Sequence, residues 1–548
     1  MRSEFASGLF AAILVAISTT PLLASNTTPV MVASAAPGRP FALGTDIMTP
    51  PGRVGRVSLT SGKVEYRAPN EAQWSPAAVN DPIAAGVALR TGPQTRAEIR
   101  IGADTIDLAE GTEIAIVKLD QLMAEIAVRG GRVNLDIPRF DPGETLQIDA
   151  SFGGVWLQQQ GRYDIDAGGG DQVARVAVFT GAARFVGRAG DIPIAAGDRI
   201  VFGAATPAKV AHESASGDEF SQWCGDRAVD DSRLAAPYFV SREMTGYAEL
   251  DQAGSWRVSE RYGPVWTPKA PPKGWLPYRD GHWRWFPPWG WSWVDNEPWG
   301  FATSHYGRWR FADNKWSWTP GKWVANPVWT PAVVAFLGTP GVGLSYPDGR
   351  GPAIAWLPLA PEEIYWPSYS YDVEYIRAVN AGIIADLSTI GLRHDGEPPA
   401  AIANAHLVNR QFASIVPRPA FIAGQEVATA LLTIPEERLL NAPTILGSPE
   451  IGPPPEPPMH AATASATREH PPGEHTSQAA KGSNWSNLVR AAVLHSREFQ
   501  EMARERYMRV REFAHGGVLQ IRHSIVLRVA HSDHTVSQPD GRKRVIRR

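Results

Sequence analysis

The chain has 548 residues, including 51 glycines, 47 prolines and one cysteine, and its formal net charge is −3. This length predicts roughly three or four domains, and the glycine and proline content favours short strands joined by turns over long helices. The single cysteine, Cys224, excludes an internal disulfide and a cysteine-based metal cluster.

The N-terminal segment predicts export. Arg2 precedes an apolar stretch from Gly8 to Ile17, which is too short to span a bilayer stably, and small residues follow at two cleavage positions, near residues 23–25 and 33–35. We expect residues 1–36 to be a signal peptide or an uncleaved N-terminal anchor. Both alternatives predict a periplasmic, secreted or envelope-tethered protein.

Residues 50–206 carry the pattern of a β domain. In Arg96–Ile101, charged and apolar side chains alternate as in a half-buried strand, and similar short runs recur between glycine-containing turns. Strands this short and regularly spaced predict a sandwich or a solenoid-like β stack. The following residues, 207–255, are expected to form a connector.

The order of landmarks in this region resembles the FecR-type periplasmic domain. Signalling members of that family join the domain to a short cytoplasmic segment that controls a sigma factor. No such segment precedes the apolar stretch here, so we expect an extracytoplasmic binding or packing module. The resemblance is carried by Gly55–Val64, Leu89–Gly92, Arg96–Ile101, Gly131–Val133, Gly161–Ile165, Val178–Ala183 and Ala195–Arg199.

Residues 256–330 are rich in tryptophan: thirteen of the twenty tryptophans lie between Trp266 and Trp329. A Gly-basic-Trp motif begins at Gly281, Gly307 and Gly321, and Trp-Ser-Trp occurs at residues 291–293 and 316–318. The two units are offset by about 26 residues, which predicts one β-hairpin in each.

Aromatic residues spaced by two share one face of a strand, and pairing across each hairpin would gather four of them on that face. Arg308 and Arg310 would then lie on the opposite, wetter face. The candidate set is Trp283, Trp285, Trp291, Trp293, Trp309, Phe311, Trp316 and Trp318 with Arg308 and Arg310.

Two interpretations of these aromatic residues remain open, and they can coexist. They form the core of a small sheet, or they form an exposed platform on which sugar rings stack. We favour the core, because tryptophan is largely buried in most proteins. Aromatic residues interleaved with basic ones are also typical of nucleic-acid binding, but the export signal argues against a nucleic-acid partner.

The tryptophan-rich region also resembles a repeat of unknown function found downstream of FecR domains in extracytoplasmic proteins. The resemblance implies architecture and compartment but no activity. Its strings here are Tyr262–Trp266, Trp289–Asp295, Pro298–Ala302, His305–Trp309, Ala353–Leu359 and Tyr365–Tyr369.

The remaining segments differ in composition. Residues 331–446 predict short strands with a helix, packed on the tryptophan-rich region, and residues 447–484 predict a disordered Pro-rich linker. Residues 485–548 form a basic tail with fourteen Lys and Arg against six Asp and Glu from Lys481 onward. Its apolar stripe from Trp485 predicts a helix that ends near His515. This helix is either simply solvated or docked on anionic lipid or envelope polysaccharide.

No motif in the sequence specifies a reaction. There is no Gly-x-Ser-x-Gly, phosphate loop or dinucleotide fingerprint, and His531 and His534 form only a lone His-x-x-His pair. We expect no enzyme activity, cofactor or metal. The favoured function is non-catalytic binding of envelope polysaccharide, peptidoglycan or partner proteins. The alternatives are a FecR-type receptor and a cell-wall glycan hydrolase, which requires two facing carboxyl groups.

Overall fold

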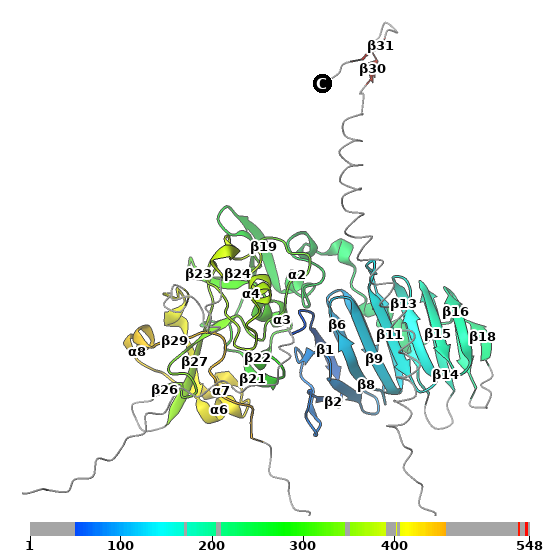
Figure 1. Cartoon of the computed structure of the whole chain (residues 1–548), viewed down its shortest axis with the longest axis horizontal. Coiled ribbons are helices and arrows are strands. Elements are labelled where there is room, and N and C mark those ends of the chain that lie inside the picture. Colours follow the sequence, from blue (N-terminus) through cyan, green and yellow to red (C-terminus); the bar gives the residue numbers. More distant parts are fainter. Residues whose placement is uncertain are drawn as a thin grey trace, which may run out of the picture. The chain divides into compact units, whose positions relative to one another are not determined.

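The computed structural model describes residues 50–168, 173–203, 210–345, 351–390, 402 and 406–455, with two short strands nearer the C-terminus (Figure 1). The fold is mainly β, as predicted. The N-terminal segment 1–36, most of the Pro-rich linker and the expected helix at 485–515 lie outside the described residues. In the tail, β30 (Thr535–Ser537) pairs with β31 (Lys543–Val545), a hairpin that the sequence did not predict.

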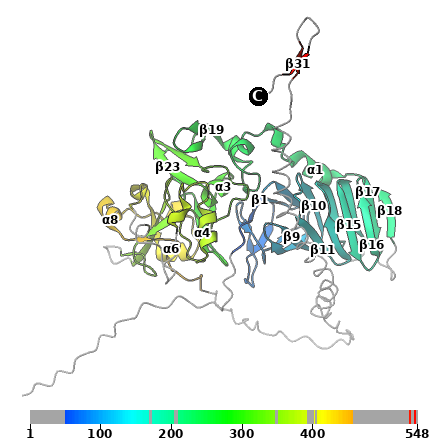
Figure 2. The ribbon, with the colours of Figure 1, turned by 45° about the horizontal axis from the view of Figure 1, so that its top comes forward.

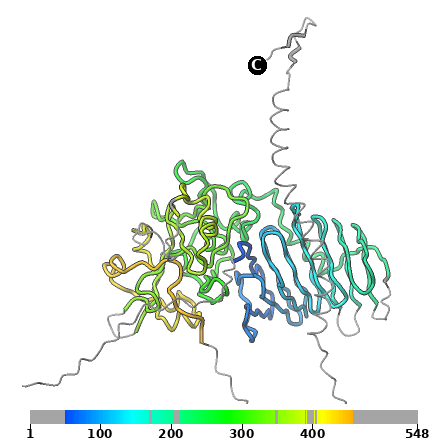
Figure 3. Tube along the Cα trace, in the orientation of Figure 1, coloured from blue at the N-terminus to red at the C-terminus, as the bar shows by residue number. Residues whose placement is uncertain are grey.

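Two nine-stranded sheets make up the N-terminal part, here called the two-sheet domain (residues 55–214). In spatial order the first contains β18 (Val210–Ser214), β17 (Asp198–Phe202), β14 (Ala174–Thr180), β13 (Gly161–Asp166), β10 (Arg132–Ile137), β7 (Asp104–Leu108), β6 (Arg96–Ile101), β1 (Gly55–Ser61) and β4 (Pro82–Ile83). The second contains β16 (Gly190–Ala195), β15 (Ala182–Gly187), β12 (Gly153–Leu157), β11 (Thr145–Ala150), β9 (Met123–Gly130), β8 (Glu113–Leu119), β5 (Ala88–Thr91), β2 (Val64–Arg67) and β3 (Ser75–Pro76). Figure 3 shows the chain running through them as successive loops laid side by side.

Alternation of apolar and polar side chains produces this sandwich. Ile99 and Leu135 of the first sheet share one hydrophobic core with Ile126 and Ile148 of the second. Most neighbouring strands are antiparallel, whereas β9 and β11 pair in parallel. The predicted alternatives of sandwich and solenoid are therefore combined, because each chain segment adds strands to both sheets in turn.

The helix α1 (Glu219–Arg227) lies against the first sheet (Figure 2) and buries a polar row on it. Glu98, Asp107, Asn134 and Asp164 are neighbours across β6, β7, β10 and β13, and all four are buried. Arg227 of α1 donates to Glu98, with 2.6 Å between Nε and Oε2. The elements that follow α1 are η1 (Asp231–Arg233), η2 (Ala236–Tyr238) and α2 (Leu250–Ala253).

Asp107 predicts a dependence of stability on pH. Burial, and then the nearby Glu98 carboxylate, raise its pKa to about 7. The folded protein therefore keeps a proton that the unfolded chain releases near pH 4. The contribution of protonated Asp107 to the free energy of unfolding is complete at low pH and is lost as pH rises through about 7. Between pH 5 and 7 we expect Asp107→Asn to flatten the decline in unfolding free energy by up to roughly 1.4 kcal/mol per pH unit, measured by urea denaturation. Parallel curves for variant and wild type would contradict this.

The tryptophan-rich part contains a four-stranded sheet, a two-stranded hairpin and a short helix. The sheet order is β19 (Gly254–Ser259), β20 (Gly263–Pro268), β24 (Lys315–Thr319) and β23 (Arg308–Ala312); the hairpin is β21 (Gly281–Phe286) with β22 (Gly290–Asp295), and the helix is α3 (Gly300–His305). Both predicted hairpins and their aromatic pairs are confirmed. The pairs are Trp283 with Trp293, Trp285 with Trp291, Trp309 with Trp318, and Phe311 with Trp316.

The glycine of the Gly-basic-Trp motif has a physical explanation in these hairpins. Gly281 and Gly307 both have positive φ, +148° and +63°. A Cβ on Gly281 would lie 2.2 Å from the Val294 carbonyl oxygen, and one on Gly307 would lie 2.4 Å from that of Thr319. Only glycine allows the two strands to approach so closely at the start of each hairpin.

Residues 334–445 add a second mixed layer over β21 and β22. Its strands are β25 (Val334–Leu337), β26 (Leu344–Ser345), β27 (Pro352–Pro358), β28 (Ser414–Pro417) and β29 (Thr444–Ile445). Its helices are α4 (Val373–Val379), η3 (Leu387–Thr389), η4 (Arg410–Phe412), α6 (Arg418–Ile422), α7 (Val427–Ala430) and α8 (Glu436–Asn441). The Trp283 ring lies 5.4 Å from the rings of Trp356 and Phe336, between centroids.

Buried polar contacts join the two-sheet domain to the tryptophan-rich part. The Asn80 side chain, whose backbone has a φ of +71°, donates to the carbonyl oxygens of Asp295 and Glu297, each at 2.8 Å. The Arg284 guanidinium donates to Asp81 Oδ1 at 2.6 Å and lies 4.3 Å from the Tyr66 ring centroid. Among the described residues, no helix has both the length and the hydropathy of a membrane span.

Candidate binding face

The structure corrects the exposed-platform interpretation of the aromatic residues. Trp285 and Phe311 are half-buried, and the other six candidates are buried. The cause is the second layer: Phe421 of α6 contacts Trp283 and Trp291, and Phe412 of η4 contacts Trp316. The six buried indoles, which cannot receive a sugar ring, are Trp283, Trp291, Trp293, Trp309, Trp316 and Trp318.

A row of four indoles crosses one face of the four-stranded sheet. Trp256 opposes Trp266, Trp266 opposes Trp318, and Trp318 opposes Trp309. Trp256 and Trp266 were absent from the candidate set because β19 and β20 precede the two repeated units. The indole N–H groups of all four find acceptors: Asp251 Oδ1 for Trp256, and the carbonyl oxygens of Leu250, Tyr306 and Thr303 for Trp266, Trp318 and Trp309. Buried rings with bonded N–H groups are typical of a core.

Arg308 differs from its predicted position on a wet face, since only 2% of it is exposed. Its guanidinium donates to the carbonyl oxygens of Glu363 and Gly307 at 2.9 and 2.8 Å and to Asn380 Oδ1 at 2.7 Å. Burial lowers the pKa of Arg308 to about 10. The segment from Glu363 to Asn380 covers this end of the sheet, so Arg308 holds that segment in place.

Arg310 is exposed, as predicted, and lies on the face opposite the indoles, here called the polar face. Three hydroxyl groups from the other strands complete one row with it: Ser255, Thr267 and Ser317. The Thr267 and Ser317 hydroxyl oxygens are 3.0 Å apart. Ser255 is exposed, and Thr267 and Ser317 are half-buried.

The polar face is cationic. None of β19, β20, β23 and β24 contains Asp or Glu, whereas Arg257, Arg310 and Lys315 are exposed on their polar side. Within the described part of the chain, no carboxylate forms an ion pair with these three groups. The Tyr262 ring lies at the edge of the face, with the guanidinium carbons of Arg261 and Arg310 each 5.1 Å from its centroid.

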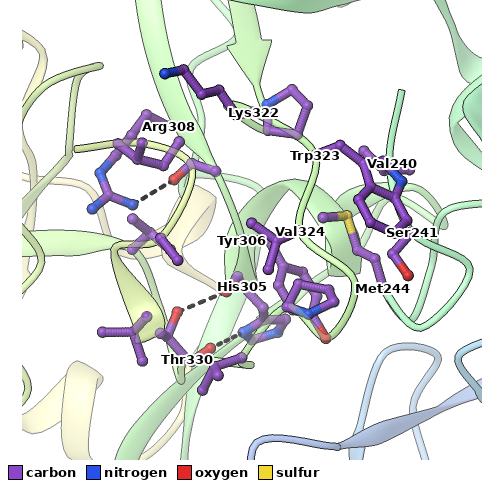
Figure 4. Close-up of a pocket in the computed structure, with 18 of the residues that line it drawn as sticks. Val240, Ser241, Met244, His305, Tyr306, Arg308, Lys322, Trp323, Val324 and Thr330 are labelled. Atoms are coloured by element: carbon purple, nitrogen blue, oxygen red, sulfur yellow. Dashed lines mark hydrogen bonds between the residues drawn. The ribbon is translucent and has the colours of Figure 1, made fainter. Parts of the chain in front are cut away.

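A cavity between α3, the chain after β24 and the segment before α2 is too small for a substrate (Figure 4). Its volume is about 30 Å³, roughly the space of one water molecule. Figure 4 shows Trp323 beside Val240 and Met244 on one side, with His305 deeper inside. Burial lowers the pKa of His305 to about 3, and its Nδ1 lies 2.6 Å from the Thr330 carbonyl oxygen. This neutral, bonded histidine holds the loop rather than moving protons.

Two further places bear on the expectation of no enzyme activity. An open depression of about 490 Å³ lies beside α1, but its polar groups already have protein partners: Arg162 donates to the Ser221 carbonyl oxygen and Asp218 accepts from Arg132. On the outer face of the second sheet, burial and the neighbouring Asp149 raise the pKa of Glu125 to about 7. Neither Glu125 nor Asp149 lines the depression beside α1 or the cavity of Figure 4.

No metal centre is assembled in the described ranges, where no three His, Cys, Asp or Glu residues are placed to hold an ion. His531 and His534 lie outside those ranges. Cys224 lies on the buried side of α1 and is hydrogen-bonded to Asp107, and burial raises its thiol pKa, which disfavours the reactive thiolate.

Comparisons with known proteins add a family for part of the chain. Residues 247–363 match a family of unknown function, DUF6600. No curated protein matches the chain. Two crystal structures of a "putative anti-sigma factor" from Parabacteroides distasonis are 12% and 13% identical over 25% and 29% of this chain, with TM-scores of 0.23 and 0.21. The chain spans 64% of the length of each, and these scores are too low to establish a common fold.

Proposed function

We propose that the chain is a non-catalytic, extracytoplasmic envelope protein that binds cell-envelope polysaccharide through the polar face of the β19–β20–β24–β23 sheet. The observation that carries the proposal is the division of this sheet into two faces. The indoles occupy one face as core. The other face presents Ser255, Arg257, Arg310 and Lys315 to solvent, whereas Val265, Arg308 and Thr319 on that face are buried.

The chemistry of the polar face suits a polyhydroxylated ligand. Sugar hydroxyls are both donors and acceptors, and so are Ser255, Thr267 and Ser317, while Arg310 adds further donors. The row crosses all four strands, and an extended polymer can contact it along more of its length than a small molecule can. Tyr262 at the edge offers an apolar ring with a hydroxyl tip.

The test is retention of the full chain on purified peptidoglycan and envelope polysaccharides. Replacing the two central hydroxyls, as Thr267→Val with Ser317→Ala, changes neither charge nor bulk much. We expect roughly tenfold weaker retention, because each lost hydrogen bond is worth about 0.5–1.5 kcal/mol. Thermal denaturation should show the same fold stability for variant and wild type.

The matched control is Thr60→Val with Ser61→Ala on β1, which removes two hydroxyls from an accessible strand of the other domain. This control should bind as the wild type does. Failure of the wild-type chain to bind any polysaccharide would overturn the proposed function, and so would equal losses in both double variants.

A further inference from the structure

We infer that the polar face binds an acidic polysaccharide whose sugar units carry carboxylates, and that the polymer crosses the four strands. The inference rests on the proposed function and adds the charge class and direction of the ligand. It is carried by the placement of Arg257, Arg310 and Lys315 among hydroxyls, on strands that contain no acidic residue.

The first step is charge complementarity. Several surface arginines elsewhere in the protein pair with carboxylates, as Arg184 does with Asp191 and Arg261 with Glu362. On the polar face three cations stand without such a partner in the described residues. A ligand that brings its own carboxylates would supply the missing partners and would be attracted at long range.

The second step concerns how the cations are spread. Arg257 lies on β19, Arg310 on β23 and Lys315 on β24, with hydroxyl groups between them. Neighbouring strands are about 4.8 Å apart, so the four strands span roughly 14 Å. A single phosphate group is bound by donors that converge on one point. Arg257, Arg310 and Lys315 lie opposite Val265, Ser317 and Ala312, in three different cross-strand registers, so the cations are dispersed over the face. Dispersed cations match a polymer that carries a charge on successive units better than they match one phosphate group.

The third step is the state of Arg310. Its guanidinium is held over the Tyr262 ring at 5.1 Å, a cation–π contact that leaves the N–H groups at the plane's edge free to donate. Those N–H groups have no acceptor among the described residues. A pre-positioned planar guanidinium can bind a carboxylate through two parallel hydrogen bonds, and less side-chain entropy is lost on binding.

The direction of the polymer follows from the two ends of the sheet. Glu260 lies in the turn between β19 and β20, and Asp313 lies in the turn between β23 and β24; both are exposed. A polyanion running along the strands would meet these carboxylates and be repelled. A polyanion crossing the strands stays over the hydroxyl row and the cations.

The experiment compares three probes on the full chain at two salt concentrations: polygalacturonate, the neutral polysaccharide pullulan, and vesicles of anionic phospholipid. The test variant is Arg257→Gln with Arg310→Gln. The charge-matched control is Arg139→Gln with Arg188→Gln, two exposed arginines outside this sheet. The basic tail is identical in all chains, so a difference between the variants reports the polar face.

We expect polygalacturonate to bind the wild type at least tenfold more tightly than pullulan does. This preference should weaken as salt rises from about 50 to 300 mM. The affinity for polygalacturonate should fall tenfold or more in the test variant. In the control variant it should stay within twofold of the wild-type value. Equal binding of pullulan and polygalacturonate overturns this inference and leaves the proposed function standing. Absence of binding to both also overturns the inference, and retention on peptidoglycan and envelope polysaccharides then decides the proposed function. Preferential binding to the vesicles, or equal losses in both variants, also overturns the inference.

Discussion

Replacing Trp293 with alanine is expected to lower the free energy of unfolding by about 3–5 kcal/mol. Trp293 is completely buried, and its indole ring packs 5.5 Å from Trp283 and 6.0 Å from Tyr278, between centroids. Its Nε1–H donates to Asp295 Oδ2 at 2.8 Å. Alanine would leave a cavity where two strands and the second layer meet, and would remove a hydrogen-bond donor from a buried carboxyl group.

The control for this variant is Trp323→Ala, in the third Gly-basic-Trp motif. Trp323 is 59% exposed and lies at the rim of the small cavity, so we expect a change within about 0.5 kcal/mol. Urea denaturation followed by circular dichroism measures both. Similar losses for the two variants would contradict the assignment of the paired indoles to the core.

Replacing Arg284 with leucine is the second large effect, and we expect a loss of about 3–5 kcal/mol. The substitution removes the partner of Asp81, which is completely buried, and leaves an uncompensated carboxylate between the two-sheet domain and the tryptophan-rich part. It also removes the contact with the Tyr66 ring. Because Arg284 lies where the two-sheet domain and the tryptophan-rich part share one hydrophobic cluster, unfolding should shift to a lower urea concentration.

A second substitution tests the reason for that loss. Adding Asp81→Asn to the Arg284 variant removes the stranded charge, and it should recover a large part of the lost stability because buried charges without partners are the costly element. If the double variant is no more stable than Arg284→Leu alone, packing rather than charge explains the effect. Proteolysis between the two regions gives an independent measure of their separation.

The two tryptophan hairpins were predictable from sequence because their cause is local. Residues spaced by two lie on one strand face, and the repeat offset sets the two hairpins. The four aromatic residues of each hairpin do pair across it, as Trp283 does with Trp293. The alternation in Arg96–Ile101 likewise predicted a strand, which is β6, but β6 is buried on both faces and not on one.

The exposure of each face was not predictable, because it depends on distant segments. Arg308 has the sequence pattern of a surface arginine, yet the chain from Glu363 to Asn380 covers it. Glu98 lies on the face of β6 that the alternation assigned to solvent. It is buried by α1, which follows it in the sequence by more than 120 residues. The polar face could not be predicted because it is formed by four strands. Two of them, β19 and β20, precede the repeat and pair with the second hairpin in one sheet.

The rate at which the single cysteine is labelled can report how often α1 detaches from the sheet. Cys224 points from α1 onto the polar row of the first sheet, and it is the sole thiol of the chain. A thiol reagent can reach it only when α1 lifts from the sheet or the domain unfolds. The dependence of the labelling rate on denaturant would separate these two routes, since a local opening exposes little new surface and global unfolding exposes much. The native chain thus carries its own probe of how firmly a helix is held over buried carboxylates.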